Sequence, residues 1–444
     1  MKKNLNPTPL RFPFLRLWRK PLNADFRRWR LAYVEMAAVV AIACLVSVSA
    51  CRKGTGMPEG PDTASQSLQP DGKAMAAVTA GAAVHTSIKL FDGGTGGFHA
   101  YRIPSIVRTT NGTLIAICEG RADNDNDYGN INVVCKTSSN NGATWSALKT
   151  IAGATLGTWG NPTAVVDWDT GRVWLFMSWN DANHSENGSG DTEPIDTWGQ
   201  RRVYVTWSDN NGATWAQPVD KTSTLLPPTM TWDAMGPGVG IQTTGGPSPG
   251  RLIIPARRRN IYSDDHGQTW HYQIIPAGTD EGTIVERANG TLMRNDRPGG
   301  TPWQAAKRRH ISTGTIEGGF SAFAPAAALP DPRCQGSIIR YAGSRSRIIF
   351  LNSASTSTRY NMTARVSYNE GQTWYASRRL HNTITQEEAA AQGKGGYSSM
   401  TKTADFAIGA LVEQKETPSS SNSHWSIEFQ KFNLPWLLNG QPEP

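Results

Sequence analysis

Charged residues and cysteines are both scarce in this chain of 444 residues: Asp, Glu, Lys and Arg together make up 18%, and there are five Cys. Three of these, Cys118, Cys135 and Cys334, follow residue 51, and no CxxC pair is present. This argues against a disulfide framework and against a zinc site, although one pair among the three could still form a bridge. A sustained heptad repeat is also missing, which argues against a coiled coil.

Positive charge is concentrated at the N-terminus. The first 50 residues carry nine Lys and Arg against Asp25 and Glu35, which accounts for +7 of the net charge of +8. The rest of the chain is therefore nearly neutral, and a broad face for binding polyanions is not indicated. We expect no nucleic-acid partner.

The apolar run from Ala37 to Val48 follows a basic segment and is too short to span a bilayer comfortably, as in an export signal. It ends in Val48-Ser49-Ala50-Cys51, which is similar to the lipobox of bacterial lipoproteins; an ordinary signal peptide and an uncleaved anchor are the alternatives. We predict a signal over residues 1–51 and a flexible linker over 52–87. The protein would then be an exported bacterial lipoprotein of the periplasm, outer membrane or cell surface, which contacts the membrane only through its lipid anchor.

One octad recurs four times, at residues 138–145, 208–215, 263–270 and 367–374, with the pattern S-x-[DN]-x-G-x-T-W. Asp or Asn can accept backbone hydrogen bonds in a tight turn, and Gly supplies the positive φ that such a turn needs. Asn replaces Asp in three copies, but its amide oxygen can accept the same bonds. We expect the Trp to re-enter a strand and pack between neighbouring sheets.

Between these turns the sequence indicates short strands at 113–118, 131–136, 173–179, 202–207, 252–255 and 348–351. The segment Thr385–Gln392 favours a short helix. Many short strands with a periodic turn are typical of a β-propeller. We predict an all-β fold, a six-bladed propeller of four-stranded antiparallel sheets over residues 88–437, followed by a tail at 438–444.

The octads resemble the Asp boxes of the sialidase (neuraminidase) superfamily, and Tyr101-Arg102-Ile103-Pro104 is similar to the (F/Y)RIP motif of that family. The resemblance extends from about Phe91 to Glu413. It implies a retaining exo-α-sialidase that acts on terminal sialic acids of glycoproteins, glycolipids and oligosaccharides. It also implies a monomer that needs no metal and no cofactor.

A sialic acid carries a carboxylate on its anomeric carbon, and the planar, bidentate guanidinium of Arg is suited to hold it. The resemblance assigns this task to three Arg. They are Arg102 of the YRIP motif, Arg297 in Asn295-Asp296-Arg297, and Arg359 in Arg359-Tyr360-Asn361-Met362. The denser cluster Arg257-Arg258-Arg259 lacks a family context, and we interpret it as rim or solvated residues.

An anionic nucleophile would be repelled by the substrate carboxylate, whereas a neutral Tyr hydroxyl avoids this if a nearby base removes its proton. Sialidases use such a Tyr. The family nucleophile matches Tyr397 in Gly395-Gly396-Tyr397-Ser398, and its activating Glu matches Glu281. Glu286 lies five residues further on, an odd offset, so in a regular strand it faces the other way.

A general acid must protonate the leaving oxygen and later act as base for water. The family acid/base matches Asp127, in a segment that also contains Asp123 and Asp125, and Arg121 matches a family Arg beside the bound sugar. A calcium loop is a rival interpretation of D-x-D-x-D, but an EF-hand would have Gly at position 128 and Glu at position 134, where this sequence has Tyr and Val.

Two further matches are peripheral. Glu413, in Leu411-Val412-Glu413, resembles the family Glu that orients the first Arg. Asn161-Pro162 stands where many relatives have Asp-Pro near the acid/base, so a substrate-binding role of Asn161 is open.

Other functions remain as alternatives to sialic acid hydrolysis. A trans-sialidase, or a hydrolase of a related nonulosonic acid, would differ in loop contacts that the sequence does not reveal. A non-catalytic propeller that binds sialylated glycans would keep the Asp boxes and the three Arg but lose Asp127, Glu281 or Tyr397. All three are present.

Overall fold

The computed structural model describes residues 81–153, 156–341, 345–416 and 424–444. The predicted signal, Cys51 and most of the predicted linker lie outside the described residues. Within the described part, no helix is long and apolar enough to cross a membrane. The first strand, β1, begins at His85, three residues before the predicted start of the propeller.

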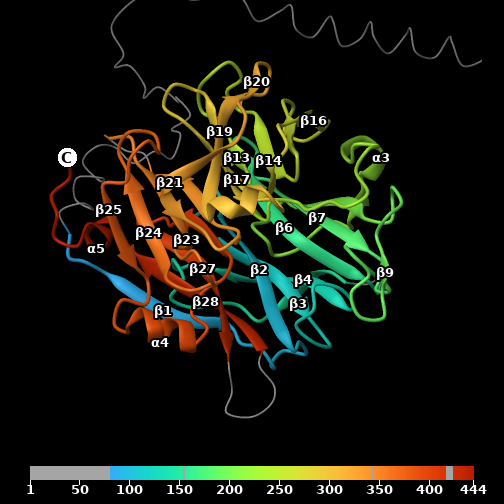
Figure 1. The fold of residues 1–444 in the computed structure, drawn as a ribbon, viewed down its shortest axis with the longest axis horizontal. Helices are drawn as coiled ribbons and strands as arrows, with labels where there is room; N and C mark the ends of the chain where they lie inside the picture. Colours follow the sequence, from blue (N-terminus) through green and yellow to red (C-terminus); the bar gives the residue numbers. More distant parts are fainter. Residues whose placement is uncertain (1–80, 154–155, 342–344, 417–423) are drawn as a thin grey trace, which may run out of the picture. The chain divides into compact units, whose positions relative to one another are not determined.

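The described residues fold into antiparallel sheets with a propeller-like arrangement (Figure 1). Three sheets have four strands each. The first consists of β1 (His85–Phe91), β28 (His424–Phe432), β27 (Ile408–Glu416) and β26 (Ser398–Lys402). The second consists of β13 (Ile241–Gln242), β14 (Leu252–Ala256), β15 (Arg259–Ser263) and β16 (His271–Ile274). The third consists of β22 (Ser337–Arg340), β23 (Ile348–Ser353), β24 (Met362–Ser367) and β25 (Ala376–Arg379).

A five-stranded sheet and a nine-stranded sheet complete the main architecture. The five-stranded sheet contains β17 (Thr279–Glu286), β18 (Leu292–Pro298), β19 (Arg308–Thr315), β20 (Gly319–Phe320) and β21 (Ala324–Pro330). The nine-stranded sheet contains β2 (Ala100–Arg108), β3 (Leu114–Arg121), β4 (Ile131–Ser138), β5 (Lys149–Ala152), β6 (Thr158–Val166), β7 (Val173–Asn180), β10 (Arg202–Ser208), β11 (Val219–Asp220) and β12 (Gly238–Val239). A separate pair joins β8 (His184–Ser185) and β9 (Glu193–Pro194).

The sheet count differs from the prediction of six separate four-stranded sheets. A parallel pairing of Ile131 with Thr158 joins β4 to β6 and merges their strands into the nine-stranded sheet. The described residues therefore contain five sheets of four or more strands. The expected strands themselves are present, each within a few residues of its predicted bounds.

The two ends of the described chain meet in one sheet. β1 pairs with β28, and His85 lies opposite Phe432, so the N-terminal strand completes the sheet made by the last three strands. In Figure 1 the blue β1 lies beside the red β28. This pairing links segments almost 350 residues apart and closes the arrangement without a disulfide among the described residues, where Cys118, Cys135 and Cys334 are free and buried.

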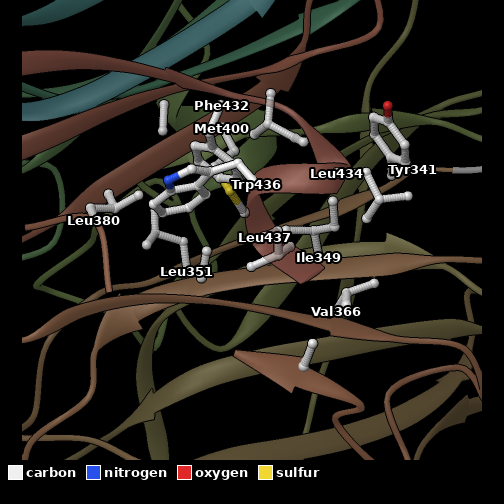
Figure 2. Close-up of a cluster of buried hydrophobic side chains, with 14 of the residues drawn as sticks. Tyr341, Ile349, Leu351, Val366, Leu380, Met400, Phe432, Leu434, Trp436 and Leu437 are labelled. Atoms are coloured by element: carbon white, nitrogen blue, oxygen red, sulfur yellow. The ribbon is translucent and has the colours of Figure 1, made fainter. Parts of the chain in front are cut away.

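The helices of the described part are short. They are α3 (Thr222–Leu225), the 3-10 helix η1 (Trp303–Ala306), α4 (Gln386–Ala391) and α5 (Leu434–Leu438). The prediction of a helix at Thr385–Gln392 is confirmed, because Thr385 caps α4 in a capping box with Glu388. α5 packs its apolar side chains into the largest hydrophobic cluster of the described residues, in which Leu434, Trp436 and Leu437 share a core with Leu351 and Met400 (Figure 2).

The four octad turns have the predicted hydrogen bonds. In the first, the Thr144 N–H donates to Asn140 Oδ1 over 2.9 Å, and the Asn210 and Asn369 turns repeat this bond at 2.9 and 2.8 Å. The Asn side chain thus replaces Asp, as expected. Gly142 has φ +87°, in the left-handed region that favours Gly. Trp145 lies after the turn and outside a strand, contrary to the prediction, but it packs edge-on against Phe429 of β28.

Candidate active site

Each predicted site residue lies near an end of a strand, at the edge of the sheets opposite the octad turns. β2 carries Arg102, and the connection after β3 carries Asp127. The other positions are Glu281 on β17, Arg297 at the end of β18, Arg359 between β23 and β24, Tyr397 just before β26, and Glu413 on β27. The contacts described below join all of these residues, which come from four different sheets.

Irregular backbone at the start of β2 shapes the first part of the site. The register of β2 against β3 shifts between Arg102 and Ser105, and Ile103 has φ +59°, which is a strained value for a β-branched residue. Pro104 has no N–H to give to a regular ladder. The Ile103 N–H instead donates to Glu413 Oε1 over 2.7 Å, so a buried carboxylate stabilises the bulge.

Arg102 is buried, and its guanidinium is surrounded by functional groups. Its Nη2 lies 3.2 Å from Glu413 Oε2, its Nη1 lies 3.2 Å from Asp127 Oδ1, and its Cζ lies 4.5 Å from the ring centre of Trp425. Glu413 also accepts the Tyr397 N–H over 2.8 Å. Burial would raise the pKa of Glu413, but Arg102 and these N–H groups hold it below its ordinary value. Glu413 therefore stays anionic and fixes both Arg102 and Tyr397.

The Tyr397 side chain is buried among three guanidinium groups. The Cζ atoms of Arg102, Arg297 and Arg359 lie 5.5, 6.0 and 5.1 Å from the centre of its ring. Arg297 Nη1 donates to the Tyr397 hydroxyl over 2.7 Å. Burial raises the pKa of Tyr397 well above its ordinary value, although Arg297 opposes the rise. The hydroxyl is therefore neutral in the free protein and needs a base before it can act as a nucleophile.

Glu281 lies close to this hydroxyl. Its Oε2 lies 2.9 Å from Arg297 Nη1, the same nitrogen that donates to the Tyr397 hydroxyl. Burial raises the pKa of Glu281 to about 7, against the opposing charge of Arg297. A carboxylate with this pKa suits proton transfer near neutrality.

Glu286 lies away from this group. Its carboxylate accepts hydrogen bonds from the backbone N–H groups of Thr244 and Gly245, at 2.7 and 2.9 Å. The prediction from strand alternation, that Glu286 faces the other way from Glu281, agrees with these contacts. Glu286 ties β17 to the hairpin before β14 and has a structural role.

Asp127 lies at the open side of the site, with its side chain 77% exposed. Its Oδ1 lies 2.7 Å from Arg121 Nη2 in addition to its contact with Arg102. Desolvation favours a higher pKa, but Arg121 and Arg102 outweigh it and hold the pKa of Asp127 below its ordinary range. Arg121 is buried and is held by Glu119, whose Oε2 accepts from its Nε at 3.1 Å and its Nη2 at 2.7 Å.

Asn161 lies next to Glu119, the residue that holds Arg121. Its Oδ1 accepts a hydrogen bond from Arg201 Nη2 over 2.6 Å, and its N–H donates to Glu119 Oε1 over 2.9 Å. It has φ +55° in a bulge followed by Pro162, which repeats the geometry of Ile103-Pro104. Sequence reasoning missed Arg201 and Glu119, and no motif distinguishes them.

Asp280 is a further residue that sequence reasoning missed. It lies 2.6 Å from Arg297 Nη2 and 3.3 Å from Arg257 Nε. The interpretation of residues 257–259 as rim or solvated Arg was wrong for Arg259. Arg259 is buried in an ion pair with Asp233 at 2.6 Å, and Arg257 is only partly exposed beside Asp280. Their partners come from distant segments, which local sequence patterns do not identify.

Two groups of side chains in the described residues have the composition of a metal site. They are Asp92 with Glu416 and His424, and Asp167 with Asp169 and His266. Neither group includes a predicted site residue. Protein donors already bind both: Lys89 Nζ lies 2.5 Å from Glu416, and Gln242 Nε2 donates to Asp167 and Asp169 at 3.1 and 2.8 Å.

Comparisons with known proteins agree on one family. Residues 104–411 match the model of the BNR repeat-like domain. The chain is 45% identical over 364 residues to an exo-alpha-sialidase of Aspergillus fumigatus, an alignment that covers 78% of this chain and 86% of the relative. It is 29% identical to a sialidase of Micromonospora viridifaciens over 80% of this chain, but that alignment spans only 55% of the relative.

Solved structures show the same fold at lower identity. The Hadza microbial sialidase Hz136 superimposes with a TM-score of 0.65 at 23% identity, over 79% of this chain and 69% of that one. The intramolecular trans-sialidase from Ruminococcus gnavus superimposes with a TM-score of 0.64 at 18% identity, over 81% of this chain and 99% of that one.

Proposed function

The chain belongs to the BNR/Asp-box superfamily of exo-α-sialidases and is a glycoside hydrolase, and we propose that it releases terminal sialic acids with retention of configuration, through Tyr397. One observation carries the proposal. The Tyr397 hydroxyl and the Glu281 carboxylate both contact Arg297 Nη1, and three guanidinium groups surround Tyr397. This is the arrangement that a neutral nucleophile beside an anionic substrate requires.

Substrate binding starts from the carboxylate on the anomeric carbon. Arg102, Arg297 and Arg359 surround the Tyr397 ring and supply three cations to hold it. Because the nucleophile is uncharged, it approaches the anomeric carbon without repulsion from that carboxylate. Arg121, which forms an ion pair with Asp127, would lie beside the sugar when it binds. Asn161 accepts a hydrogen bond from Arg201 Nη2.

The first chemical step transfers the sugar to the enzyme. Glu281 takes the phenolic proton of Tyr397, the phenolic oxygen forms a bond to the anomeric carbon, and the glycosidic bond breaks as Asp127 donates its proton to the leaving oxygen. In the second step Asp127 takes a proton from water, the water oxygen attacks the same carbon, and Tyr397 leaves with the proton held by Glu281. Two inversions give net retention.

Asp127 must be protonated for the first step, yet in the free protein it is ion-paired with Arg102 and Arg121. The substrate carboxylate competes with Asp127 for Arg102. When it binds, the positive charge of Arg102 is neutralised, and one of the two main causes of the low Asp127 pKa is removed. Binding of the substrate carboxylate thereby favours protonation of Asp127, the general acid.

The finer architecture and location follow as proposals of the same kind. The strand groups β2 to β5 and β6, β7, β10 and β11 each contain four strands, which supports counting the nine-stranded sheet as two blades of a six-bladed propeller.

We propose that the protein is a monomeric lipoprotein that is acylated at Cys51 and exported. Labelled palmitate should tag the wild-type protein and not the Cys51→Ser variant; an unlabelled wild-type protein would contradict this.

The activity is tested with α2,3-, α2,6- and α2,8-linked sialosides, by chromatography of the products and by NMR of the first-formed anomer. Free sialic acid that appears first as the α-anomer is the expected result. Transfer of sialic acid to an acceptor would favour a trans-sialidase, and faster release of another nonulosonic acid would change the substrate. Binding of sialosides without any turnover would contradict the proposal.

A further inference from the structure

Asp280 is the centre of a cluster of Arg side chains at the edge of the site. Its Oδ2 lies 2.6 Å from Arg297 Nη2 and 3.8 Å from Arg333 Nη2, and its Oδ1 lies 3.3 Å from Arg257 Nε. The three Arg come from the end of β18, the connection before β22 and the β14–β15 turn. Asp280 therefore connects three neighbouring segments, and its side chain is only 13% exposed.

The contacts of Asp280 with Arg297 parallel those of Glu413 with Arg102. Glu413 binds Nη2 of Arg102, and Asp280 binds Nη2 of Arg297. In both cases one terminal nitrogen is held by a carboxylate, so the orientation of the guanidinium plane is fixed. Arg297 Nη1 is then directed towards the Tyr397 hydroxyl and Glu281.

We propose that Asp280 is a positioning residue for catalysis: it orients Arg297 towards the substrate carboxylate and places a permanent negative charge beside Glu281. The proposal rests on the proposed function and deepens it. The charged partners of Asp280 are Arg257, Arg297 and Arg333, and it acts through Arg297 and through its charge.

Electrostatics support this role. Desolvation would raise the pKa of Asp280, but Arg297 and Arg257 hold it below its ordinary value, so Asp280 stays ionised. The charged and titratable groups that face Glu281 are Arg297, Asp280, Tyr397 and Arg359. After burial, Asp280 is the group that keeps the Glu281 pKa high, at about 7. Loss of the Asp280 charge should therefore let Glu281 ionise at lower pH.

The test compares wild type, Asp280→Asn and Asp280→Glu by steady-state kinetics from acid to neutral pH. For Asp280→Asn we expect KM to rise about tenfold, because Arg297 loses a charge-assisted partner, and the acidic limb of kcat/KM to move to lower pH. Asp280→Glu keeps the charge and should restore most of the binding and the wild-type acidic limb.

Glu286→Gln is the matched control, because it removes a buried carboxylate from the same strand without contact to Arg297. Its acidic limb should coincide with that of wild type. If Asp280→Asn lowers the melting temperature but leaves KM and the acidic limb at wild-type values, Asp280 is structural and the proposal fails. A wild-type protein without sialidase activity would instead overturn the proposed function.

Discussion

The two edges of the sheets differ in how the backbone is held. At the octad edge, four turns repeat one hydrogen bond, in which an Asn or Asp side chain accepts from the backbone N–H four residues further on. At the opposite edge, β2, β6 and β17 each lose register near a site residue. Buried carboxylates from other strands bond to the irregular backbone of β2 and β6. The octad edge is local and repeated, whereas the site edge is assembled from distant segments.

This difference indicates that the octad edge contributes mainly to stability and the site edge mainly to catalysis. A turn that satisfies its own backbone groups costs little and can repeat. The site edge instead buries carboxylates such as Glu281 and Glu413 and a strained Ile103, which are costly features that a functional site tolerates. Substitutions at the site edge should change turnover, and substitutions at the octad edge should change stability.

Tyr397→Phe is the strongest test of this division between a site edge that controls turnover and an octad edge that controls stability. The change removes one oxygen and leaves the ring and its three guanidinium neighbours, so we expect kcat to fall by about 10⁴-fold or more. Binding of sialic acid, measured by calorimetry, and the melting temperature should stay close to wild type. A loss of folding in place of turnover would place Tyr397 in the core and contradict the division.

Glu281→Ala and Glu286→Ala form a matched pair on β17. Without Glu281, Tyr397 keeps its proton, and we expect kcat to fall by about 10³-fold. Glu286→Ala should lower stability and leave kcat unchanged, because the Glu286 carboxylate bonds to Thr244 and Gly245, away from the site. Equal losses of turnover in two well-folded variants would reverse this assignment.

The pH dependence of stability should reveal the cost of the Glu281 carboxylate. Its pKa rises from an ordinary 4.5 to about 7 on folding, so its contribution to stability is full below 4.5 and is lost as the pH rises through 7. The loss is on the order of 3 kcal/mol. Urea unfolding from pH 4 to 8 should show this decline in wild type and a flatter curve in Glu281→Gln; identical curves would contradict the assigned pKa.

Gly142→Ala should give a smaller effect, confined to the octad edge. Gly142 has φ +87°, and an added Cβ would lie 2.2 Å from the Phe429 ring of the neighbouring sheet. We expect a loss of about 2 kcal/mol in the free energy of unfolding. The kcat of the folded fraction should equal that of wild type, and a change of kcat at unchanged stability would show that the two edges are coupled.

The sequence predicts the octad edge well because each turn is encoded within eight residues. Asn140, Asn210 and Asn369 accept the bonds expected of Asp, and the strands between the turns lie close to their predicted positions. The number of separate sheets was predicted less well, because one parallel pairing between β4 and β6 depends on how neighbouring groups approach each other.

The site edge was predictable only where a family motif exists. Strand alternation separates Glu281 from Glu286, but the same rule directs Asp280 away from Glu281. The register shift between Thr279 and Gly282 breaks the alternation, so that both Asp280 and Glu281 bind Arg297. Arg259 was misjudged because its partner, Asp233, is distant in sequence and has no motif.

The central claim is that Tyr397 forms the bond to the sugar, and trapping of the covalent intermediate tests it most directly. Incubation with a fluorinated sialic acid that slows the second step, followed by proteolysis and mass spectrometry, should add one sugar mass to the peptide that contains Tyr397. The Tyr397→Phe protein should carry no adduct. An adduct on Asp127, or none in a wild-type protein that the reagent has inactivated, would contradict the account.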